Sequence, residues 1–484
     1  MQNSRRIRFS SLLGAGASMV LGTAGMLVSG ALFAAEACTP GASCTPSSPN
    51  CQQCDQVFAD AAAQLKNLNP GGCAPAACAA PSACADVCNP DAVFNAGCNG
   101  GCGGGQRELG DPWPLQGALA HPCKPANGWQ VGGWTQFGYS NNPDGAFTGN
   151  AIFLDDRYEW DRLNLNQQYF YLRKVADGSN GLDFGGSADL MYGVDGNEGQ
   201  SFGNDPGEFD FLNGFDHGAY EWAIPQLYGE VAYGKVSAKV GHFYTPTGYE
   251  VIPPAGNFFY SHQLTWYNSE PFYHTGVLTN YQVNDNLSLQ NGWVLGWDTG
   301  FDQNDGGNCY LGGFTYKFNE CTTFIEGVTW GDLGWRGNGF MSSSILTHKW
   351  TDRISSVHQF DVLGTDLEIA VPLGPFGFLQ QDVPSDFAVN GITRDSVSVL
   401  NYVFYDVTDR VKTGIRQEWY KADSISYYTL TYGLNVKPMA NLVIRPEVRH
   451  MWSPGNDIVY VNSQGGGEDL FNQTVFGIDA VLTY

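Results

Sequence analysis

Charge is scarce in this chain, and positive charge most of all. Asp, Glu, Lys and Arg make up 15% of the 484 residues, and 48 acidic residues stand against 24 basic ones, which gives a net charge of −24. From residue 124 onward the chain has 41 acidic and 19 basic residues. Such a balance repels the phosphate backbone of DNA and RNA, so nucleic acid is excluded as a partner.

Long hydrophobic runs are also missing. No segment after residue 35 contains the ~20 consecutive apolar residues of a transmembrane helix. If this part of the chain crosses a membrane, it does so as a closed β-barrel, because only closure satisfies every backbone group in lipid. The chain has instead 62 Gly, 29 Phe, 24 Tyr and 13 Trp, a composition typical of short strands and aromatic girdles.

Cysteine is nearly absent from the second part of the chain, where only Cys309 and Cys321 follow residue 123. The other eleven lie among Pro, Ala, Gly and Ser: Cys38, Cys44, Cys51, Cys54, Cys73, Cys78, Cys84, Cys88, Cys98, Cys102 and Cys123. In an exported chain this pattern predicts a disulfide-stapled segment, since a segment without a core needs covalent links. Zinc is the alternative, although only Cys51 and Cys54 have a suitable spacing.

The first 37 residues have the pattern of a secretory signal peptide. Basic residues at positions 5, 6 and 8 precede an apolar, small-residue run that ends near Phe33, and Ala35–Ala37 fits a cleavage site. Residues 38–125 then form the cysteine-rich periplasmic segment with its linker, and residues 126–484 form the last domain. An uncleaved anchor helix and a lipid-modified Cys38 are the alternatives.

From Trp129 onward, apolar residues alternate with small or polar ones, as in β-strands. Residues 184–194 and 428–436 are clear examples. The last eleven residues place one apolar set on a single face: Phe476, Ile478, Ala480, Leu482 and Tyr484. An apolar outside with a polar inside indicates an outer-membrane barrel, whereas a soluble sandwich would use the apolar face as its core.

The lengths of the connections favour the barrel. Short turns are expected at 175–181, 234–235, 284–286, 319–321, 351–353, 408–410 and 437–441. Long loops are expected at 140–162, 195–221, 245–272, 298–308, 332–341, 364–394 and 453–471, with a short link at 422–425. This alternation is the plan of outer-membrane barrels, whose periplasmic turns are short. We predict an all-β fold: a transmembrane antiparallel β-barrel of about 16 strands, closed by residues 129–139 and 474–484, with an N-terminal cysteine-rich extension.

Residues 129–484 resemble the bacterial β-barrel porin family described as OmpL-like. The motifs that carry the resemblance are Leu227–Tyr233, Val240–Glu250, Phe258–Ser261, Phe272–Gly276, Ser342–Lys349 and Thr351–Arg353. The resemblance implies a multi-pass porin in the lipid of the outer membrane, passing small solutes or ions, but it implies no particular substrate. The cysteine-rich segment lies outside it.

Charged residues at positions that face the lumen are candidates for lining a pore and setting its ion selectivity. Strand alternation places eight of them inside: Glu230, Lys239, Lys412, Arg416, Glu418, Arg445, Glu447 and Arg449. Each could instead brace the wall as part of an ion pair. Because the chain is acidic, we expect passive diffusion of small hydrophilic solutes with a preference for cations.

The loop at 245–272 is long and partly apolar, which is typical of a loop that folds into a barrel and narrows it. Its candidate constriction residues are Glu250, Phe258, Phe259 and Tyr260. The alternative is a loop packed on the barrel rim or on a neighbouring molecule.

Chemistry other than transport has little support in the sequence. Asp302, Asn304 and Asp305 offer oxygen ligands in a Gly-rich loop, so calcium is a candidate ligand there and a solvated loop is the alternative; no other cofactor is expected. A hydrolase would draw on four residues, but nothing in their spacing brings a nucleophile to a base: His242, Ser261, His262 and His274. We therefore expect no catalytic residues and no enzyme activity.

The two remaining cysteines lead to a structural prediction. Cys309 starts a strand at its outer end and Cys321 lies in the turn at the other end, so roughly 30 Å of strand separates them. A disulfide needs Cα atoms within ~7 Å, so these two should not pair. Cys321 is instead expected to tie the cysteine-rich segment to the barrel. This suggests a rival function, a structural envelope protein whose barrel anchors residues 38–123 while those residues join the cell wall or neighbouring copies in a homo-oligomer.

Overall fold

The computed structural model describes residues 128–141, 162–203, 206–215, 219–301, 306–367, 369–372, 378–381, 393–454 and 472–484, together with Leu115. The predicted signal peptide and the eleven N-terminal cysteines lie outside the described residues. The calcium candidates lie outside them as well: Asp302, Asn304 and Asp305.

Strands dominate the described chain. In chain order they are β1 (Gln130–Ser140), β2 (Leu163–Lys174), β3 (Asp183–Gly193), β4 (Glu221–Ala223), β5 (Leu227–Tyr233), β6 (Val236–Tyr244), β7 (Tyr273–Asn284), β8 (Leu287–Val294), β9 (Asn308–Asn319), β10 (Thr322–Asp332), β11 (Asn338–Lys349), β12 (Ile354–Thr365), β13 (Ile369–Pro372), β14 (Phe378–Gln381), β15 (Asp395–Thr408), β16 (Val411–Ala422), β17 (Ile425–Met439), β18 (Leu442–Trp452) and β19 (Asn472–Thr483). Short helical turns lie in the connections: η1 (Gly178–Asn180), α5 (Gly196–Gly199), α6 (Phe209–Leu212), η2 (Pro254–Gly256) and α7 (Leu264–Ser269). No helix among the described residues is long and apolar enough to cross a membrane.

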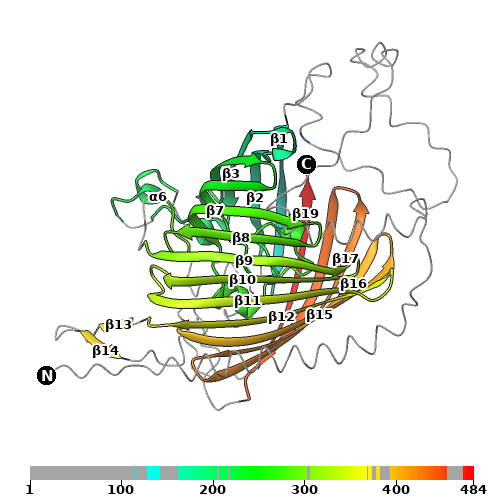
Figure 1. Ribbon diagram of the computed structural model, residues 1–484. Helices are drawn as coiled ribbons and strands as arrows, with labels where there is room; N and C mark the ends of the chain where they lie inside the picture. Colours follow the sequence, from blue (N-terminus) through cyan, green and yellow to red (C-terminus); the bar gives the residue numbers. More distant parts are fainter. Residues whose placement is uncertain are drawn as a thin grey trace, which may run out of the picture. The chain divides into compact units, whose positions relative to one another are not determined.

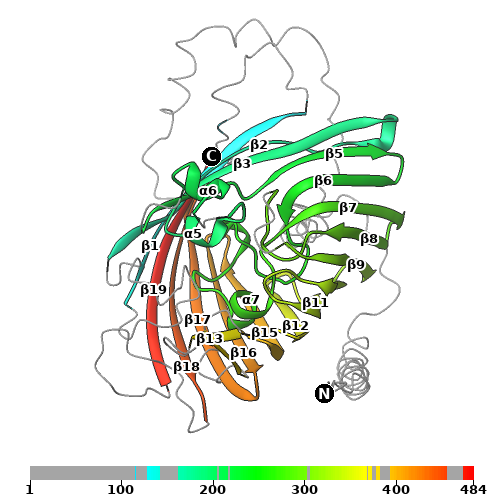
Figure 2. The ribbon, with the colours of Figure 1, turned by 90° about the vertical axis from the view of Figure 1, so that its left-hand side faces the viewer.

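The strands form one closed antiparallel barrel (Figures 1 and 2). Its closing seam pairs β1 with β19, from Trp134 opposite Thr483 to Ser140 opposite Gly477. The short β4 and β5 both pair with β3 and act as one wall strand, interrupted at Pro225, which has no N–H for a ladder. The barrel therefore has 16 wall strands, while β13 and β14 pair with each other in a separate sheet. The predicted strand count and the closure by the first and last strands are confirmed.

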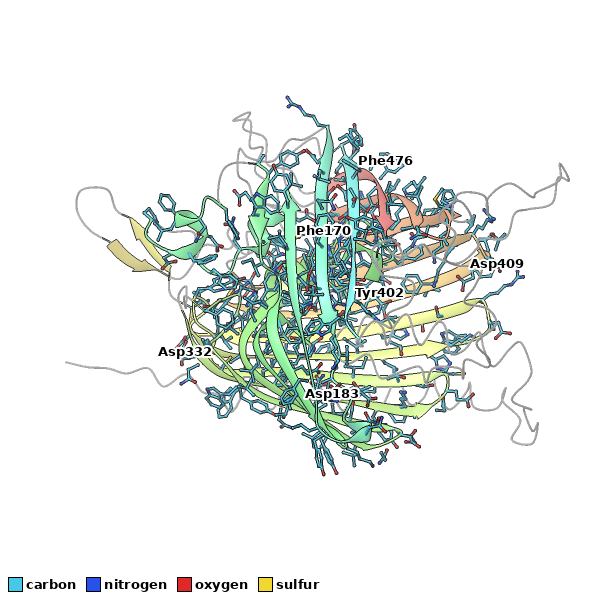
Figure 3. The ribbon with its side chains drawn as sticks, turned by 90° about the horizontal axis from the view of Figure 1, so that it is seen from above. Phe170, Asp183, Asp332, Tyr402, Asp409 and Phe476 are labelled. Atoms are coloured by element: carbon cyan, nitrogen blue, oxygen red, sulfur yellow. The ribbon has the colours of Figure 1, made fainter. Side chains whose placement is uncertain are left out.

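The connections also follow the prediction. Each of the seven expected short turns separates two wall strands, as at residues 234–235 between β5 and β6. Figure 3 shows Asp332 at the long-loop end of the barrel, Asp409 at the short-turn end, and Tyr402 between them. In outer-membrane barrels the short turns face the periplasm.

Alternate residues of a strand meet different surroundings. In β19, Phe476 and Leu482 are exposed on the outer face, whereas Val475, Asp479 and Val481 are buried inside. The same exposed apolar row continues on other strands at Phe184, Leu190, Val403, Leu430 and Val448. This is the surface that lipid requires, and it confirms which face the alternation assigned to the membrane.

The interior contains more apolar side chains than the alternation indicates. One buried cluster includes Leu278, Leu311, Met341 and Leu363. The apolar alternation of Leu289, Trp293, Leu295 and Trp297 predicts one outward-facing row, but this is wrong for Trp297, because β8 ends at Val294 and Trp297 is fully buried beyond it. Part of the barrel interior is therefore filled by a hydrophobic core.

Cys309 has a free thiol and is buried near the start of β9, while Cys321 lies in the turn between β9 and β10. The two therefore form no disulfide, as predicted. The expected link from Cys321 to the N-terminal cysteines involves partners outside the described residues.

Candidate functional site: a loop inside the barrel

The connection from β6 to β7, residues 245–272, lies inside the barrel, and we call it the inner loop. Figure 2 shows its helix, α7, among the wall strands, and all six residues of α7 are buried. The contacts of the inner loop extend to strands more than 150 positions further along the chain. These contacts determine what space remains in the lumen.

Two glutamates of the wall accept hydrogen bonds from the inner-loop backbone. Glu418 on β16 accepts from the N–H groups of Leu264 (3.0 Å) and Thr265 (2.8 Å) at the start of α7. Glu447 on β18 accepts from the next segment upstream, at Tyr260 N (2.8 Å) and Ser261 N (3.1 Å). The first N–H groups of a helix have no partner within it and carry partial positive charge, so a carboxylate matches them in both respects.

Glu250 is the most highly coordinated side chain of the inner loop. Its carboxylate accepts hydrogen bonds from Arg416 Nη1 (2.7 Å), Tyr402 Oη (2.9 Å) and Gln263 N (2.9 Å), and His262 Nδ1 lies 3.1 Å away. Burial alone would raise the pKa of Glu250, but Arg416 and His262 outweigh it and lower the pKa to about 2. The carboxylate is therefore charged over the physiological pH range and binds the loop firmly to β15 and β16.

Arg445 on β18 binds the loop through its carbonyl groups. Its Nη1 atom donates to Pro254 O and Asn257 O, both at 2.7 Å. Its Nε atom donates to Asp479 of β19 at 2.8 Å, and Asp479 also accepts from Gln136 of β1 at 2.7 Å. This chain of bonds joins the inner loop to the closing seam of the barrel.

Glycines of the wall make room for the aromatic residues of the inner loop. They face the lumen on β1, β16, β17 and β19: Gly138, Gly414, Gly433 and Gly477. A Cβ atom on Gly414 would lie 2.7 Å from the ring of Phe258, and one on Gly138 would lie 2.2 Å from Tyr260 Oη. Non-bonded atoms do not approach that closely, so Phe258, Phe259 and Tyr260 fit against the wall only at positions that have no side chain.

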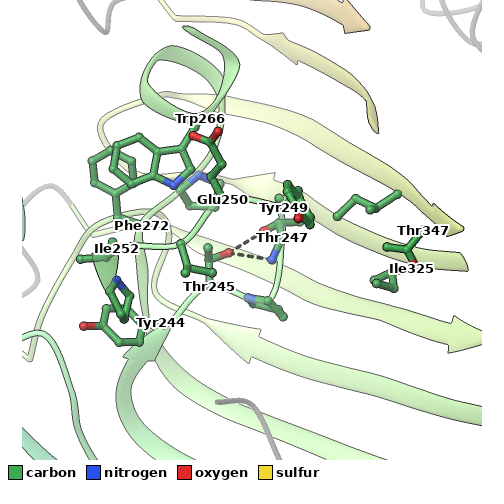
Figure 4. Close-up of a pocket in the computed structure, with 16 residues that line it drawn as sticks. Tyr244, Thr245, Thr247, Tyr249, Glu250, Ile252, Trp266, Phe272, Ile325 and Thr347 are labelled. Carbon is green, nitrogen blue, oxygen red and sulfur yellow. Dashed lines mark hydrogen bonds between the residues drawn. The ribbon is translucent and has the colours of Figure 1, made fainter. Parts of the chain in front are cut away.

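Two cavities border the inner loop. The larger has a volume of about 580 Å³ and lies at the short-turn end, between Asn257 and Phe258 of the loop and wall residues such as Lys412. The smaller has a volume of about 40 Å³ and lies between the loop and the strands β10 and β11 (Figure 4). Three residues line both cavities, which therefore adjoin: Tyr249, Pro253 and Thr347.

Comparison with known proteins agrees with this architecture. Residues 128–484, most of the chain, match the family model described as "Putative beta-barrel porin-2, OmpL-like". The chain belongs to this porin family. It is accordingly a multi-pass protein of the outer membrane. No curated protein sequence matches the chain significantly.

Among solved structures, the porin is similar to the outer membrane channel DcaP of Acinetobacter baumannii, with 11% identity over 75% of this chain and 99% of that chain and a TM-score of 0.45. It is also similar to an anion-selective porin from Comamonas acidovorans, with 11% identity over 74% and 99% and a TM-score of 0.46. A third is a loop-deletion mutant of OmpT from Vibrio cholerae, with 10% identity over 74% and 99% and a TM-score of 0.43.

The eight charged residues assigned to the lumen have different surroundings in the porin. Four of them contact the inner loop or its neighbours through the bonds described above: Arg416, Glu418, Arg445 and Glu447. Arg449, two residues after Glu447 on β18, is 1% exposed. Arg416 and Arg445 form ion pairs with Glu250 and Asp479, whereas Glu418 and Glu447 accept hydrogen bonds from the loop backbone. These four charges are therefore bound to protein groups.

The other three lie toward the short-turn end. Glu230 and Lys239 are opposite each other on β5 and β6, and both are buried. Glu230 accepts a hydrogen bond from Ala176 N at 3.1 Å, and Lys239 Nζ lies 4.7 Å from the centre of the Tyr228 ring. Lys412 has a side chain that is 30% exposed, and it borders the larger cavity. Among the eight, it is therefore the candidate best placed to act on a passing ion.

A second carboxylate of the inner loop was not singled out from the sequence. Gln359 Nε2 on β12 donates to Glu270 Oε1 (2.6 Å) and to Asp361 Oδ2 (2.7 Å), so the two acids share one amide. Both carboxylates are buried. Burial raises the pKa of Glu270, and the adjacent Asp361 raises it further. No sequence pattern pairs these residues, because they lie on separate elements.

The histidines and the serine of the hydrolase alternative have other partners. Ser261 Oγ accepts from Arg416 Nη2 at 2.9 Å, and His242 Nδ1 lies 2.8 Å from Thr275 Oγ1. His274 Nδ1 lies 2.9 Å from Gly296 O. Within the described part of the chain, no group of three or more acidic, histidine or cysteine side chains could hold a metal ion.

Proposed function

We propose that this porin lets small hydrophilic solutes diffuse passively across the outer membrane, through the space that the inner loop leaves in the barrel. One observation carries the proposal: the inner loop is seated within the lumen by charged side chains of the wall and borders two adjoining cavities. A loop fixed in this position sets the width of the open path, and diffusion along that path requires no bond to be made or broken. We therefore assign the protein a transport activity rather than a catalytic one.

We further propose that the small ions that pass are mainly cations. The support is the charge of residues 124–484, which carry 41 acidic and 19 basic residues, so the field around the barrel attracts cations. A reversal-potential measurement across a salt gradient tests this directly. Selectivity for anions would refute the preference without affecting the pore itself.

Planar-bilayer recording of the purified full chain tests the pore. Stepwise conductance is expected, together with swelling of protein-containing liposomes in sugars below a size limit. The rival function, an envelope anchor acting through residues 38–123, predicts a silent bilayer and disulfide-linked multimers on non-reducing gels. That combination would replace the transport proposal.

A further inference from the structure

The inner loop is held differently on its two sides. Toward β15, β16 and β18 it is held by ion pairs and charged hydrogen bonds, as at Glu250 and Glu418. Toward β10 and β11, Tyr249 and Ile252 of the loop face Ile325 and Ile345 across the smaller cavity. The connection between these two strands adds one charged contact at the far end of the loop, from Arg336 Nη2 to Asn268 O at 2.7 Å. Side chains that meet across such a space are held only by weak, undirected dispersion contacts, so we expect the loop to separate from the wall most readily beside Tyr249 and Ile252.

The smaller cavity lies on that same side. Its wall residues include Ile325 and Ile345, which are paired opposite each other on β10 and β11, and Thr347 two positions further along. Tyr249 and Ile252 of the loop line it as well (Figure 4). Its volume of about 40 Å³, against about 580 Å³ for the larger cavity, makes it the narrower of the two spaces. Apolar side chains form most of its lining, and it adjoins the larger cavity at Tyr249, Pro253 and Thr347.

We propose that solutes pass between the inner loop and strands β10 and β11, and that Ile325, Ile345 and Tyr249 form an apolar neck that favours small uncharged solutes over hydrated ions. This inference rests on the proposed function and adds the route and the solute class to it. An ion that enters this neck loses hydration, and the one charged group that lines it, Glu250, is already paired with Arg416. A small neutral molecule loses much less hydration there. The neck therefore lowers the total ion current and leaves its sign to charges elsewhere.

The variants Ile345→Ala and Ile345→Ser in the full chain test the route. Each shortens the side chain in the neck, and serine also offers a hydroxyl group to passing ions. Single-channel conductance in KCl should rise several-fold in both, with the larger rise for serine, while liposome swelling in a small neutral sugar changes less. Met341→Ala is the matched control, because Met341 is on the same strand, is fully buried in another cluster and borders neither cavity.

A second variant covers the case in which the Ile345 variants do not fold. Thr347→Cys places a thiol where the two cavities adjoin, and a charged thiol reagent should then reduce the current. Wild-type protein with its own cysteines is the control for that reagent. A current that the reagent leaves unchanged would overturn the route.

The outcomes separate the inference from the function on which it rests. If wild-type protein produces neither conductance steps nor swelling, the proposed function fails. The wild-type protein could instead conduct while folded Ile345 variants keep wild-type conductance, or Met341→Ala could raise conductance as much as they do. In either case the neck lies elsewhere, and only the inference about the route fails.

Discussion

Arg416 Nη1 and Glu250 Oε1 form an ion pair 2.7 Å long inside the barrel, although the two residues are 166 positions apart in the chain. The side chain of Arg416 is fully buried and that of Glu250 is 4% exposed. A buried ion pair of this kind contributes little net stability compared with apolar residues, but removing one partner leaves an uncompensated charge. The pair therefore specifies where the inner loop sits.

Replacing Arg416 by Met should release this part of the inner loop. Breaking a buried pair costs about 3–5 kcal/mol, because Glu250 is then left without its main counter-charge. We expect a lower thermal transition in detergent and larger, noisier conductance steps in bilayers. The double variant Arg416→Met with Glu250→Gln should recover part of the lost stability. If the single variant retains wild-type conductance and melting, the pair does not hold the loop.

Gly414→Ala should also disturb the inner loop, for a steric reason. The added Cβ atom would lie 2.7 Å from the ring of Phe258 and 2.8 Å from that of Phe404, and overpacking of this kind costs about 1–3 kcal/mol. Roughly a twofold change in single-channel conductance is expected. Gly229→Ala on β5 is the matched control, since its Cβ would have no atom within 4 Å. If the two substitutions change conductance equally, the change comes from the barrel wall in general and not from the contact between Gly414 and the inner loop.

Glu270 should make stability depend on pH. Its pKa in the folded protein is raised above the ordinary value of 4.5 by burial and by Asp361, and Glu250 adds to the rise. The protonated Glu270 carboxyl therefore makes its full contribution to the free energy of unfolding below about pH 4.5. That contribution is lost as the pH rises through the pKa that Glu270 has in the folded protein. The temperature of the thermal transition should fall over that pH interval, and Glu270→Gln should make this temperature depend less on pH. Glu320→Gln, in the exposed turn after β9, should leave the slope unchanged.

Lys412 should influence ion selectivity more than the buried lysine does. Lys412 borders the larger cavity and its side chain is 30% exposed, whereas Lys239 is 5% exposed and lies against a tyrosine ring. Lys412→Glu should shift the reversal potential towards cations, and Lys239→Gln should shift it little. A larger shift from the Lys239 variant would place the ion path beside β5 and β6.

Much of the barrel could be predicted because its signals are local. Alternation along a strand and the length of a turn depend on neighbouring residues, so the strands, the turns and the closure by residues 474–484 could be read directly. The break at Pro225 and the early end of β8 depend on single residues and went unrecognised. The wall alternation also placed Arg416 and Glu447 inside the barrel.

The seat of the inner loop could not be predicted in the same way. Which wall residue meets Glu250 depends on how the closed barrel brings distant strands across the lumen, and no spacing in the chain encodes that. The sequence does contain one indication of the loop's position. Glycine repeats at lumen-facing positions where a side chain would be expected, at Gly414, Gly433 and Gly477. Inward glycines on several strands indicate that something bulky lies against them.

The way the inner loop is held has a consequence for assembly. The loop leaves the wall after β6, yet its bonds to Tyr402 and Arg445 join residues 152 and 191 positions apart. The loop therefore cannot reach its final position until β15 to β18 have been added, close to the moment when β19 meets β1. Contacts of such long sequence separation form slowly. Sealing of the barrel and filling of its interior thus belong to one late folding event, so a nascent barrel remains hollow until its last strands arrive.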